Sequence, residues 1–306
     1  MQHIFIMGSG AVGGFYGALL AQADGMNVTF IARGAHLEAM KKNGLVITGL
    51  MNKRLDDIRA ESDPARIHHP PDLVLMTVKS FDTKQAIEQL RPVVASGTLI
   101  LTIQNGLENY ELLAEAFGSR VIRGFCKIGA EVTSPGVIDY RGLSHVFFGE
   151  ENGEPSNRVI QIQKIMEYAG INATVSNKIR KEAWLKFIWN GIFNMLTGLS
   201  KSATNLVFED GNAYKTAWQL FFEMQAVAGA DGVIISDKEG GKIIDDTRNL
   251  GAFLTSTCQD RRKGKRLEFD AFCGYVVRKA DAYKLGVPAT RTLFALYRML
   301  EKAGEA

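Results

Sequence analysis

The sequence predicts an α/β protein in which a doubly wound, largely parallel sheet is followed by an all-helical domain. One observation is the opening of the chain: an apolar run, a glycine-rich turn, a helical segment and a second apolar run lie within the first 33 residues. Another is the alternation of strand-like runs with helical segments over the first half. Beyond residue 177 no convincing strand appears. We therefore expect a first domain over residues 1–176 and a second over residues 177–306.

The first domain offers a signal for each expected element in turn. Short apolar runs predict the strands, and segments with apolar residues three or four apart predict the helices between them. Ser134-Pro135-Gly136 lies between two short apolar runs and predicts a hairpin. The strands are expected at residues 3–7, 28–32, 73–78, 99–103, 121–122, 131–132, 137–138, 146–148 and 173–175, and the helices at 14–20, 82–90, 107–117 and 158–168.

The second domain is predicted to consist of long helices punctuated by glycines. Residues 233–235 give an ambiguous strand signal in an otherwise helical pattern. Breaks between helices are expected at Gly198, Gly211, Gly232 and Gly264, and at Gly286-Val287-Pro288.

The glycine-rich turn has the form G-x-G-x-x-G and follows the first strand directly. Its first glycine permits the tight turn, its second lets the backbone approach a pyrophosphate, and its third lets the helix pack closely on the strand. The N-terminus of the helix offers N–H groups and the positive end of the helix dipole to the phosphates. The order strand, turn, helix, strand therefore predicts a dinucleotide site on a Rossmann-type domain, formed by Gly8, Ser9, Gly10, Ala11, Val12 and Gly13.

The residue after the second strand indicates which dinucleotide binds. NAD-binding domains usually carry an acidic residue there, which binds the ribose 2′-hydroxyl. Here Arg33 follows the strand, and no acidic residue is adjacent in the sequence. A guanidinium suits a 2′-phosphate, and Lys79 adds a second cation at the end of another strand. The two cations favour NADPH/NADP⁺ over NAD(H); the alternative is that Arg33 is an ordinary solvated loop residue.

The composition is that of an ordinary globular enzyme. Of the 306 residues, 46% are hydrophobic and 23% are charged. The net charge of +3 is too small to indicate a nucleic acid or membrane partner, and no apolar run reaches membrane-spanning length. The three cysteines lack the spacing of a disulfide framework or a zinc site, and no secretory signal is expected. We expect a cytoplasmic, metal-free protein with a small-molecule substrate, for which a homodimer is one option.

Residues 179–196 are predicted to form a helix that is apolar on most sides yet carries one polar row. Glu182, Lys186, Asn190 and Asn194 recur at a spacing of four, which places them on one face. Because the rest of the helix is apolar, this row is expected to face a cleft rather than bulk water. One lysine with two asparagines suits a small hydroxylated acid, and the alternative is an ordinary solvated stripe.

Two further candidates lie later in the chain. Glu268 sits among large apolar residues at the start of a predicted helix, where a glutamate is also a routine partner of the helix dipole. Ser256 lies in a short polar segment, and a helical serine often bonds only its own backbone. Neither residue would indicate a site by itself.

Taken together, these pieces resemble the ketopantoate reductases (2-dehydropantoate 2-reductases) over nearly the whole chain. The glycine motif alone is generic, whereas the Lys-Asn-Asn helix followed by Ser256 and Glu268 at this spacing is far more specific. The matching segments are Gly8 to Gly13, Arg33, Thr77-Val78-Lys79, Gln104-Asn105-Gly106, residues 180–186 with Asn190 and Asn194, Leu267-Glu268-Phe269-Asp270, and residues 285–290.

The resemblance implies NADPH-dependent reduction of 2-dehydropantoate to (R)-pantoate, a step toward pantothenate and coenzyme A. It implies that Lys186 is the proton donor and that Glu268 helps to orient substrate and cofactor. The remaining implied contacts are Asn105 near the nicotinamide and substrate, Ala130 at the cofactor, and Asn190, Asn194, Ser256 and an asparagine near Asn205 at the substrate.

Two other functions stay open on the residues alone. One is an NADP(H)-dependent reductase of another branched 2-oxo or 3-hydroxy acid on the same scaffold. The other is a non-catalytic NADP(H) sensor, which would leave the row of Lys186, Asn190 and Asn194 without a role.

Overall fold

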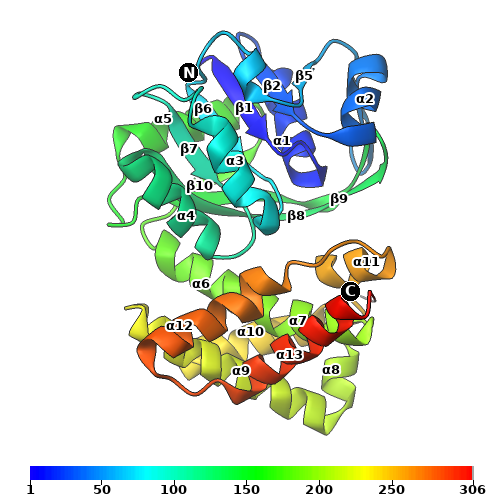
Figure 1. Ribbon diagram of the computed structural model, residues 1–306, viewed down its shortest axis with the longest axis vertical. Helices are drawn as coiled ribbons and strands as arrows, with labels where there is room; N and C mark the ends of the chain where they lie inside the picture. The colour runs from blue at the N-terminus through cyan, green and yellow to red at the C-terminus, as the bar shows by residue number, and fades with distance from the viewer. Residues whose placement is uncertain (305–306) are drawn as a thin grey trace. The chain divides into compact units, whose positions relative to one another are not determined.

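The computed structural model describes residues 1–304 and divides the chain into two compact units (Figure 1). The first unit contains residues 1–105 and 109–179. The second contains residues 106–108 and the chain from Arg180 onward. The main division between the units therefore falls after residue 179, whereas the sequence analysis placed it after residue 176.

The first unit is built on a ten-stranded mixed sheet in the order β4-β3-β9-β8-β7-β6-β1-β2-β5, with β10 paired to β9. Only the β3–β4 and β8–β9 pairs are antiparallel. The strands are β1 (His3–Met7), β2 (Asn27–Ile31), β3 (Leu45–Gly49), β4 (Lys53–Leu55), β5 (Arg59–Glu61), β6 (Leu73–Met76), β7 (Leu99–Thr102), β8 (Val121–Ser134), β9 (Val137–Gly149) and β10 (Asn172–Val175). The helices are α1 (Ala11–Ala21), α2 (Gly34–Asn43), α3 (Thr83–Leu90), α4 (Glu108–Phe117) and α5 (Asn157–Tyr168), with short 3₁₀ turns η1 (Pro64–Arg66), η2 (Ser80–Asp82) and η3 (Gly118–Arg120).

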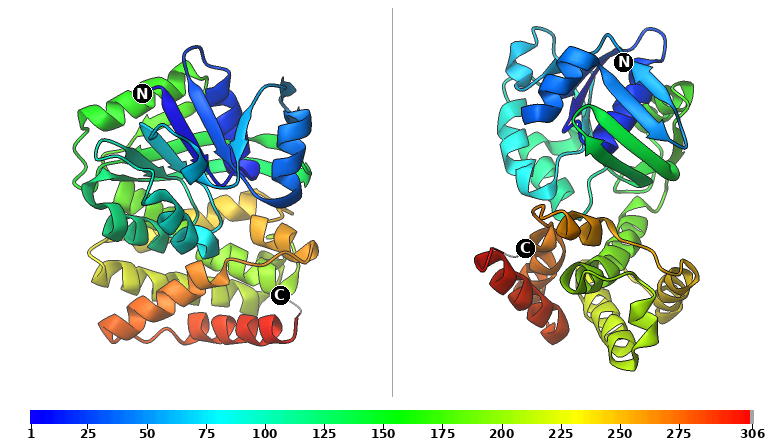
Figure 2. Two further views of the ribbon diagram at one scale, coloured as in Figure 1. Left: turned by 45° about the horizontal axis from the view of Figure 1, so that its top comes forward. Right: turned by 90° about the vertical axis from the view of Figure 1, so that its right-hand side faces the viewer.

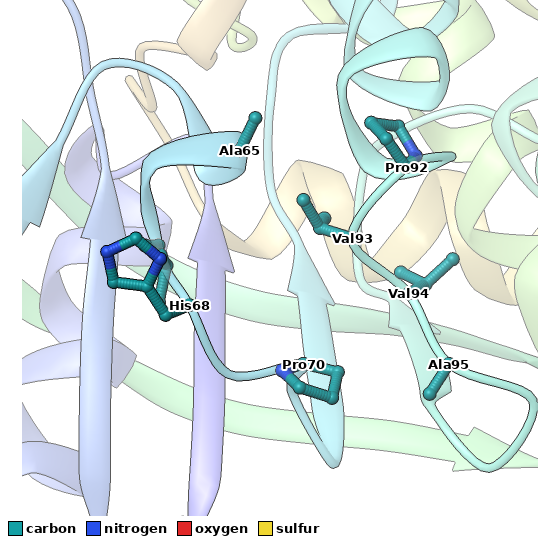
Figure 3. A pocket seen from close by; sticks show the side chains of 8 residues that line it. Ala65, His68, Pro70, Pro92, Val93, Val94 and Ala95 are labelled. Atoms are coloured by element: carbon teal, nitrogen blue, oxygen red, sulfur yellow. The ribbon is translucent and has the colours of Figure 1, made fainter.

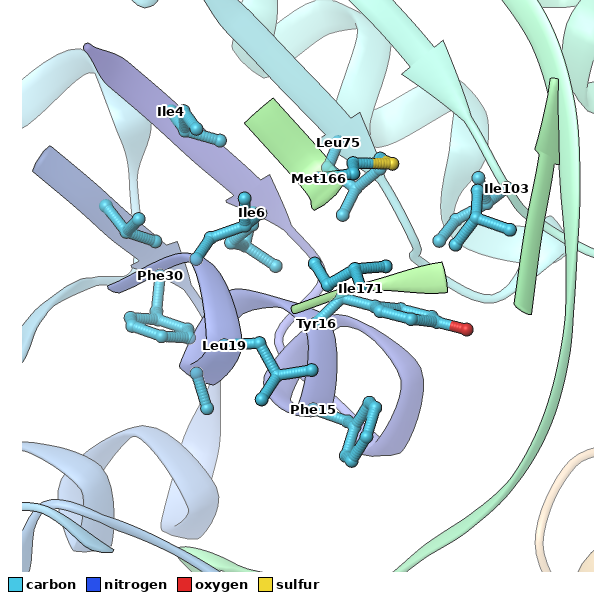
Figure 4. Close-up of a cluster of buried hydrophobic side chains, with 14 of the residues drawn as sticks. Ile4, Ile6, Phe15, Tyr16, Leu19, Phe30, Leu75, Ile103, Met166 and Ile171 are labelled. Carbon is cyan, nitrogen blue, oxygen red and sulfur yellow. The ribbon is translucent and has the colours of Figure 1, made fainter. Parts of the chain in front are cut away.

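Both faces of the sheet are covered, so its central strands β1, β6 and β7 consist mostly of apolar residues. Successive side chains of a strand point to opposite faces. Ile4 and Ile6 of β1 accordingly join one core cluster, whereas Phe5 and Met7 join the other. The first cluster includes α1 side chains such as Phe15, packed beside the strand residues in Figure 4.

The topology brings the ends of three strands together. In the sheet β1 lies between β2 and β6, so the chain leaves β1 for β2 on one side and later places β6 on the other. Ligands of open α/β sheets bind beside the carboxyl ends of the strands at such a switch point. The segments that follow β1, β2 and β6 contain the glycine turn, Arg33 and Lys79, respectively.

The sheet is larger than the sequence indicated. The strands β3, β4 and β5 were not expected. Strands β4 and β5 have only three residues each and carry charged side chains, whereas β3 contains the short apolar run Leu45-Val46-Ile47, which the sequence analysis did not assign to a strand. The predicted hairpin at Ser134 to Gly136 is present, but its strands have 14 and 13 residues. Most of the second half of β8 and the first half of β9 is only partly buried, which blurs the alternation on which a strand prediction depends.

The second unit, as far as residue 304, is helical throughout (Figure 2). Its elements are α6 (Ile179–Trp189), the π-helix η4 (Asn190–Asn194), α7 (Met195–Ser200), α8 (Leu206–Glu209), α9 (Gly211–Ala230), α10 (Asp237–Asn249), α11 (Ser256–Arg262), the π-helix η5 (Asp270–Gly274), α12 (Tyr275–Tyr283) and α13 (Pro288–Lys302). None of the helices described up to residue 304 is long and apolar enough to cross a membrane.

The structure refines one local expectation for this unit, corrects a second and settles one ambiguous signal. The predicted helix over 179–196 is divided by η4, which widens one turn. Gly198 lies inside α7 rather than at a break, because a Cβ there would meet the Thr257 Cγ2 atom at 2.7 Å; the glycine serves close packing. Residues 233–235 form an irregular connection between α9 and α10, not a strand.

Candidate active site

The glycine turn is shaped by three different demands on its three glycines. Gly8 has φ +99°, a conformation that L side chains rarely adopt. At Gly13 a Cβ would lie 2.4 Å from both the Gly8 carbonyl oxygen and the Thr77 Oγ1 atom, so α1 can approach β1 and β6 only without a side chain there. Gly10 differs, since its backbone is ordinary and a Cβ would meet nothing within 4 Å.

The turn fits a pyrophosphate. Gly10 is exposed and immediately precedes α1, so the space that a side chain would fill lies at the start of the helix. The first N–H groups of a helix have no carbonyl partner in a preceding turn and carry the positive end of the dipole. No acidic residue occupies the first turn of α1. The residues present therefore suit the phosphates of a dinucleotide.

The fold brings an acid to Arg33 that the sequence did not reveal. Arg33 caps α2, and its guanidinium forms an ion pair of 2.5 Å with Asp82 and a hydrogen bond of 3.2 Å to Gln85 Oε1. Asp82 closes η2, three residues after the exposed Lys79. No acidic residue is adjacent to Arg33 in the sequence, but Asp82 contacts it in the folded chain. The two residues are 49 positions apart, so the sequence alone does not reveal the pair.

Asn105 follows β7 and is half-buried. Its carbonyl accepts a hydrogen bond from the Asn109 Nδ2 atom at 2.6 Å. The preceding Gln104 is buried, and its Nε2 atom donates to the Val78 carbonyl at 2.9 Å. The bond from Gln104 joins the segment after β7 to the segment after β6, and the bond from Asn109 stabilises the segment after β7 itself. Ala130 lies in β8 opposite Tyr140, at an irregularity of the pairing, and is half-buried.

An open pocket elsewhere in the first unit is not part of this site (Figure 3). It is lined by the segments that lead into β6 and β7, including His68, Pro70 and Pro92. It therefore lies at the amino-terminal ends of those strands. The glycine turn, Arg33 and Lys79 lie beyond the carboxyl ends.

In the second unit, the π-helix η4 presents two buried asparagines. Asn190 and Asn194 are 5% and 1% exposed, and the Asn194 Nδ2 atom donates to Asn190 Oδ1 at 3.2 Å. The other amide atoms, Asn190 Nδ2 and Asn194 Oδ1, have no hydrogen-bond partner among the described residues. Either orientation of the two amides leaves one donor and one acceptor open. Since an unpaired buried polar group costs about 1–3 kcal/mol, this pair is suited to a polar ligand.

Lys186 lies one turn before Asn190, on α6, and is half-buried. Glu182 lies one turn earlier still, and its buried Oε2 atom also lacks a hydrogen-bond partner in the described chain. Aromatic side chains on the same helix, Trp184 and Phe187, pack against Tyr275 of α12. The polar row of the sequence analysis is therefore largely buried, and it is not a solvated stripe.

The remaining candidates lie on or next to other elements of the second unit, and two of these elements pack against η4. Glu268 is half-buried and lies two residues before η5, and the two π-helices pack against each other. Ser256 begins α11, which packs against α7 and η4, but its side chain is exposed. Asn205 caps α8 and donates to Glu209 Oε1 at 2.6 Å, so its side chain is engaged locally.

Comparisons with known proteins agree over the whole chain. The family description "Ketopantoate reductase PanE/ApbA" matches residues 4–153, and its C-terminal counterpart matches residues 178–301. A 2-dehydropantoate 2-reductase of Pyrococcus horikoshii is 30% identical over 98% of both chains. A PanE/ApbA family ketopantoate reductase of Ralstonia eutropha JMP134 superposes with a TM-score of 0.91 at 31% identity, covering all of both chains. A D-mandelate dehydrogenase solved with NADH and anilino(oxo)acetate shares the fold, with a TM-score of 0.89 at 20% identity over all of both chains.

Gly10→Ala tests whether the open space at the turn is reserved for a ligand. The variant should fold with an unchanged melting temperature, because the added Cβ meets nothing. Dinucleotide binding should weaken by about 1–3 kcal/mol, as expected for an extra methyl group in a close contact. Calorimetric titration with NADPH measures the loss. The matched control is Gly97→Ala, also at an open and exposed glycine, and equal affinities in the two variants would contradict the prediction.

Proposed function

Because the chain belongs to the ketopantoate reductase family, we propose that it reduces 2-dehydropantoate to (R)-pantoate with NADPH. Members of the family are NAD(P)-dependent oxidoreductases, which accounts for the dinucleotide turn of the first unit. The observation that carries the proposal is the buried pair Asn190 and Asn194, one turn beyond Lys186, with an open donor and an open acceptor. A non-catalytic sensor of the dinucleotide would have no use for this pair.

The nicotinamide, when bound, supplies a hydride to the 2-oxo carbon of the substrate. The carbonyl oxygen gains negative charge as that bond forms, and it needs a proton to become the product hydroxyl. Lys186 donates this proton and stabilises the developing charge with its ammonium group. Lys186 is half-buried, and its neighbours along the chain Trp184, Phe187 and Asn190 are buried, which limits competition from water.

The asparagines hold the substrate by its polar groups. A hydroxyl group can both accept from Asn190 Nδ2 and donate to Asn194 Oδ1, which are the two atoms left open. Glu268 orients the substrate and cofactor, and Ser256 adds a polar contact. In the first unit, Asn105 and Ala130 lie beside the cofactor.

Arg33 and Lys79 bind the 2′-phosphate and give NADPH its advantage over NADH. Arg33 reaches this role by exchanging a carboxylate partner, Asp82, for a phosphate. The exposed ion pair is weak, whereas a charged hydrogen bond to a phosphate is stronger.

The substrate is tested with purified protein and a panel of 2-oxo acids with NADPH. We expect the highest kcat/KM with 2-dehydropantoate. A higher kcat/KM with another branched 2-oxo acid, or with phenylglyoxylate, the 2-oxo acid that corresponds to mandelate, would mean that the protein carries out the same reduction on a different substrate. No turnover of any acid despite NADPH binding would favour the sensor.

Arg33→Ala should lower the affinity for NADPH and leave that for NADH unchanged. The loss of a charged hydrogen bond to the 2′-phosphate corresponds to about 1.5–3 kcal/mol, or roughly 10- to 150-fold in Kd. Fluorescence titration of both cofactors measures it. Asp82→Asn removes the competing carboxylate, so it should strengthen NADPH binding instead. Equal losses for both cofactors in Arg33→Ala would refute the assignment.

Asn194→Ala should lower kcat/KM for the substrate without weakening NADPH binding. The variant leaves the Asn190 amide and the bound substrate short of a partner, which costs about 1–3 kcal/mol of transition-state stabilisation. Steady-state kinetics at saturating NADPH measures the change. Asn212→Ala, in the exposed first turn of α9, is the matched control. A native kcat/KM in well-folded Asn194→Ala would return the pair to a purely structural role.

Lys186→Ala should lower kcat by about 10²–10⁴-fold, the usual contribution of a general acid. NADPH affinity should stay close to native, since the glycine turn and Arg33 belong to the other unit. Lys186→Arg separates the two roles of the lysine, because a guanidinium keeps the positive charge but does not release a proton. Low turnover in both variants supports proton donation. Near-native turnover in Lys186→Arg would mean that Lys186 stabilises charge but does not donate the proton. Near-native turnover in Lys186→Ala would exclude Lys186 from both roles.

A further inference from the structure

His36 connects the glycine turn to a distant hairpin. It lies in the first turn of α2, three residues after Arg33, and is half-buried. Its Nε2 atom is 2.9 Å from the Ser9 carbonyl oxygen, and the Gly136 N–H donates to its Nδ1 atom at 3.1 Å. Gly136 is in the turn between β8 and β9. Nothing in the glycine motif indicates this contact, because 27 residues separate His36 from Ser9.

The two bonds fix the tautomer of the ring. A backbone N–H can only donate, so Nδ1 must carry a lone pair, and a carbonyl can only accept, so Nε2 must carry the hydrogen. Both bonds are satisfied only by the neutral Nε2–H form. Burial lowers the pKa of His36 below its ordinary value of 6.5, which keeps this neutral form dominant at neutral pH.

The bond to Ser9 fixes a particular peptide plane. The Ser9 carbonyl is held by His36, while the Gly10 N–H at the opposite edge of the same planar peptide donates to the Gly8 carbonyl at 2.9 Å. The Gly10 carbonyl then accepts from the Gly14 N–H at 2.7 Å and begins α1. The plane just before the helix is therefore held at both edges, and it sets how the first N–H groups of α1 are directed.

The other end of the bridge is also anchored. Gly136 has φ +78°, and its carbonyl accepts from the Val46 N–H of β3 at 2.9 Å. His36 is thus held between two rigid backbone segments. It is suited to hold the turn in place rather than to touch the ligand itself.

We propose that His36 is a positioning residue for the phosphate-binding turn, whose neutral Nε2–H tautomer holds the Ser9–Gly10 peptide in the orientation that a dinucleotide pyrophosphate requires. The inference rests on the dinucleotide site proposed above. The proposed roles of two residues at the start of α2 therefore differ. Arg33 acts on the 2′-phosphate alone, whereas His36 acts on the pyrophosphate, which NADPH and NADH share.

The test compares His36→Ala with His36→Gln and His36→Asn. Titration calorimetry gives the Kd of NADPH, NADH and ADP for each folded variant. His36→Ala should weaken all three by a common factor of about three- to tenfold, the effect of losing one neutral hydrogen bond. In glutamine the amide Nε2 can replace the donor to Ser9, so His36→Gln should recover most of the affinity. Asparagine is too short to reach Ser9 in this way, so His36→Asn should stay close to His36→Ala.

Several results would overturn the proposal. Native affinities in His36→Ala, or a loss confined to NADPH, would remove the positioning role. Equal affinities in His36→Gln and His36→Ala, with only the melting temperature lowered, would make the residue merely structural. Imidazole ¹⁵N shifts of the native protein give an independent readout that needs no variant, and an Nδ1–H tautomer would exclude the bridge. Failure of the proposed dinucleotide site is distinct, because the native protein would then bind none of the three ligands, and failure of the proposed reduction alone would leave their affinities unchanged.

Discussion

The close approach of α1 to the ends of β1 and β6 is the constraint on which the candidate dinucleotide site of the first unit depends. At Gly13 there is no room for a methyl group between the helix, the Gly8 carbonyl and Thr77. The Thr77 hydroxyl donates to the Gly8 carbonyl at 2.9 Å and to the Met7 carbonyl at 3.2 Å, which closes the gap with hydrogen bonds. Because the helix starts directly at the strand ends, its N-terminus lies between the segments that follow β2 and β6. Those are the segments that carry the two cations.

The parts of this arrangement that are local in sequence could be predicted, and those that depend on tertiary contacts could not. The order of strand, turn and helix around Gly8 to Gly13 follows from apolar periodicity and from glycine chemistry. The pairing of Arg33 with Asp82 has no sequence signal, since it depends on β2 and β6 flanking β1. The bridge from His36 to Ser9 and Gly136 is hidden for the same reason. The short strands β4 and β5 are stabilised by their neighbours more than by their own composition.

In the second unit, a spacing of four residues predicted a polar face but not its geometry. An α-helix and a π-helix give the same sequence pattern over one turn, so the widening at η4 could not be foreseen. Gly191 within that turn has a reason of its own, because a Cβ would lie 2.5 Å from the Met224 Cε atom of α9. The π-helix thus packs closely against α9 at Gly191. The amide groups of Asn190 and Asn194 are buried, and each has one atom without a hydrogen-bond partner among the described residues. Buried amide atoms without hydrogen bonds raise the free energy of the unliganded protein, and a polar ligand that bonds to them can offset this cost.

The cation site contains a comparable balance, and magnitudes decide its outcome. The Arg33 side chain is 57% exposed and that of Asp82 is 24% exposed, so their pair is that of a surface ion pair, worth about 0.2–1 kcal/mol. A charged hydrogen bond from Arg33 to a 2′-phosphate contributes about 1.5–3 kcal/mol. Under the proposed role of Arg33, exchanging Asp82 for the phosphate would still favour NADPH, but by less than an arginine without a carboxylate partner would. Asp82 also keeps Arg33 beside the segment after β6, close in the chain to Lys79. The proposed preference for NADPH would thus be a difference between two modest interactions, and it would depend on Arg33 and Asp82 together rather than on Arg33 alone.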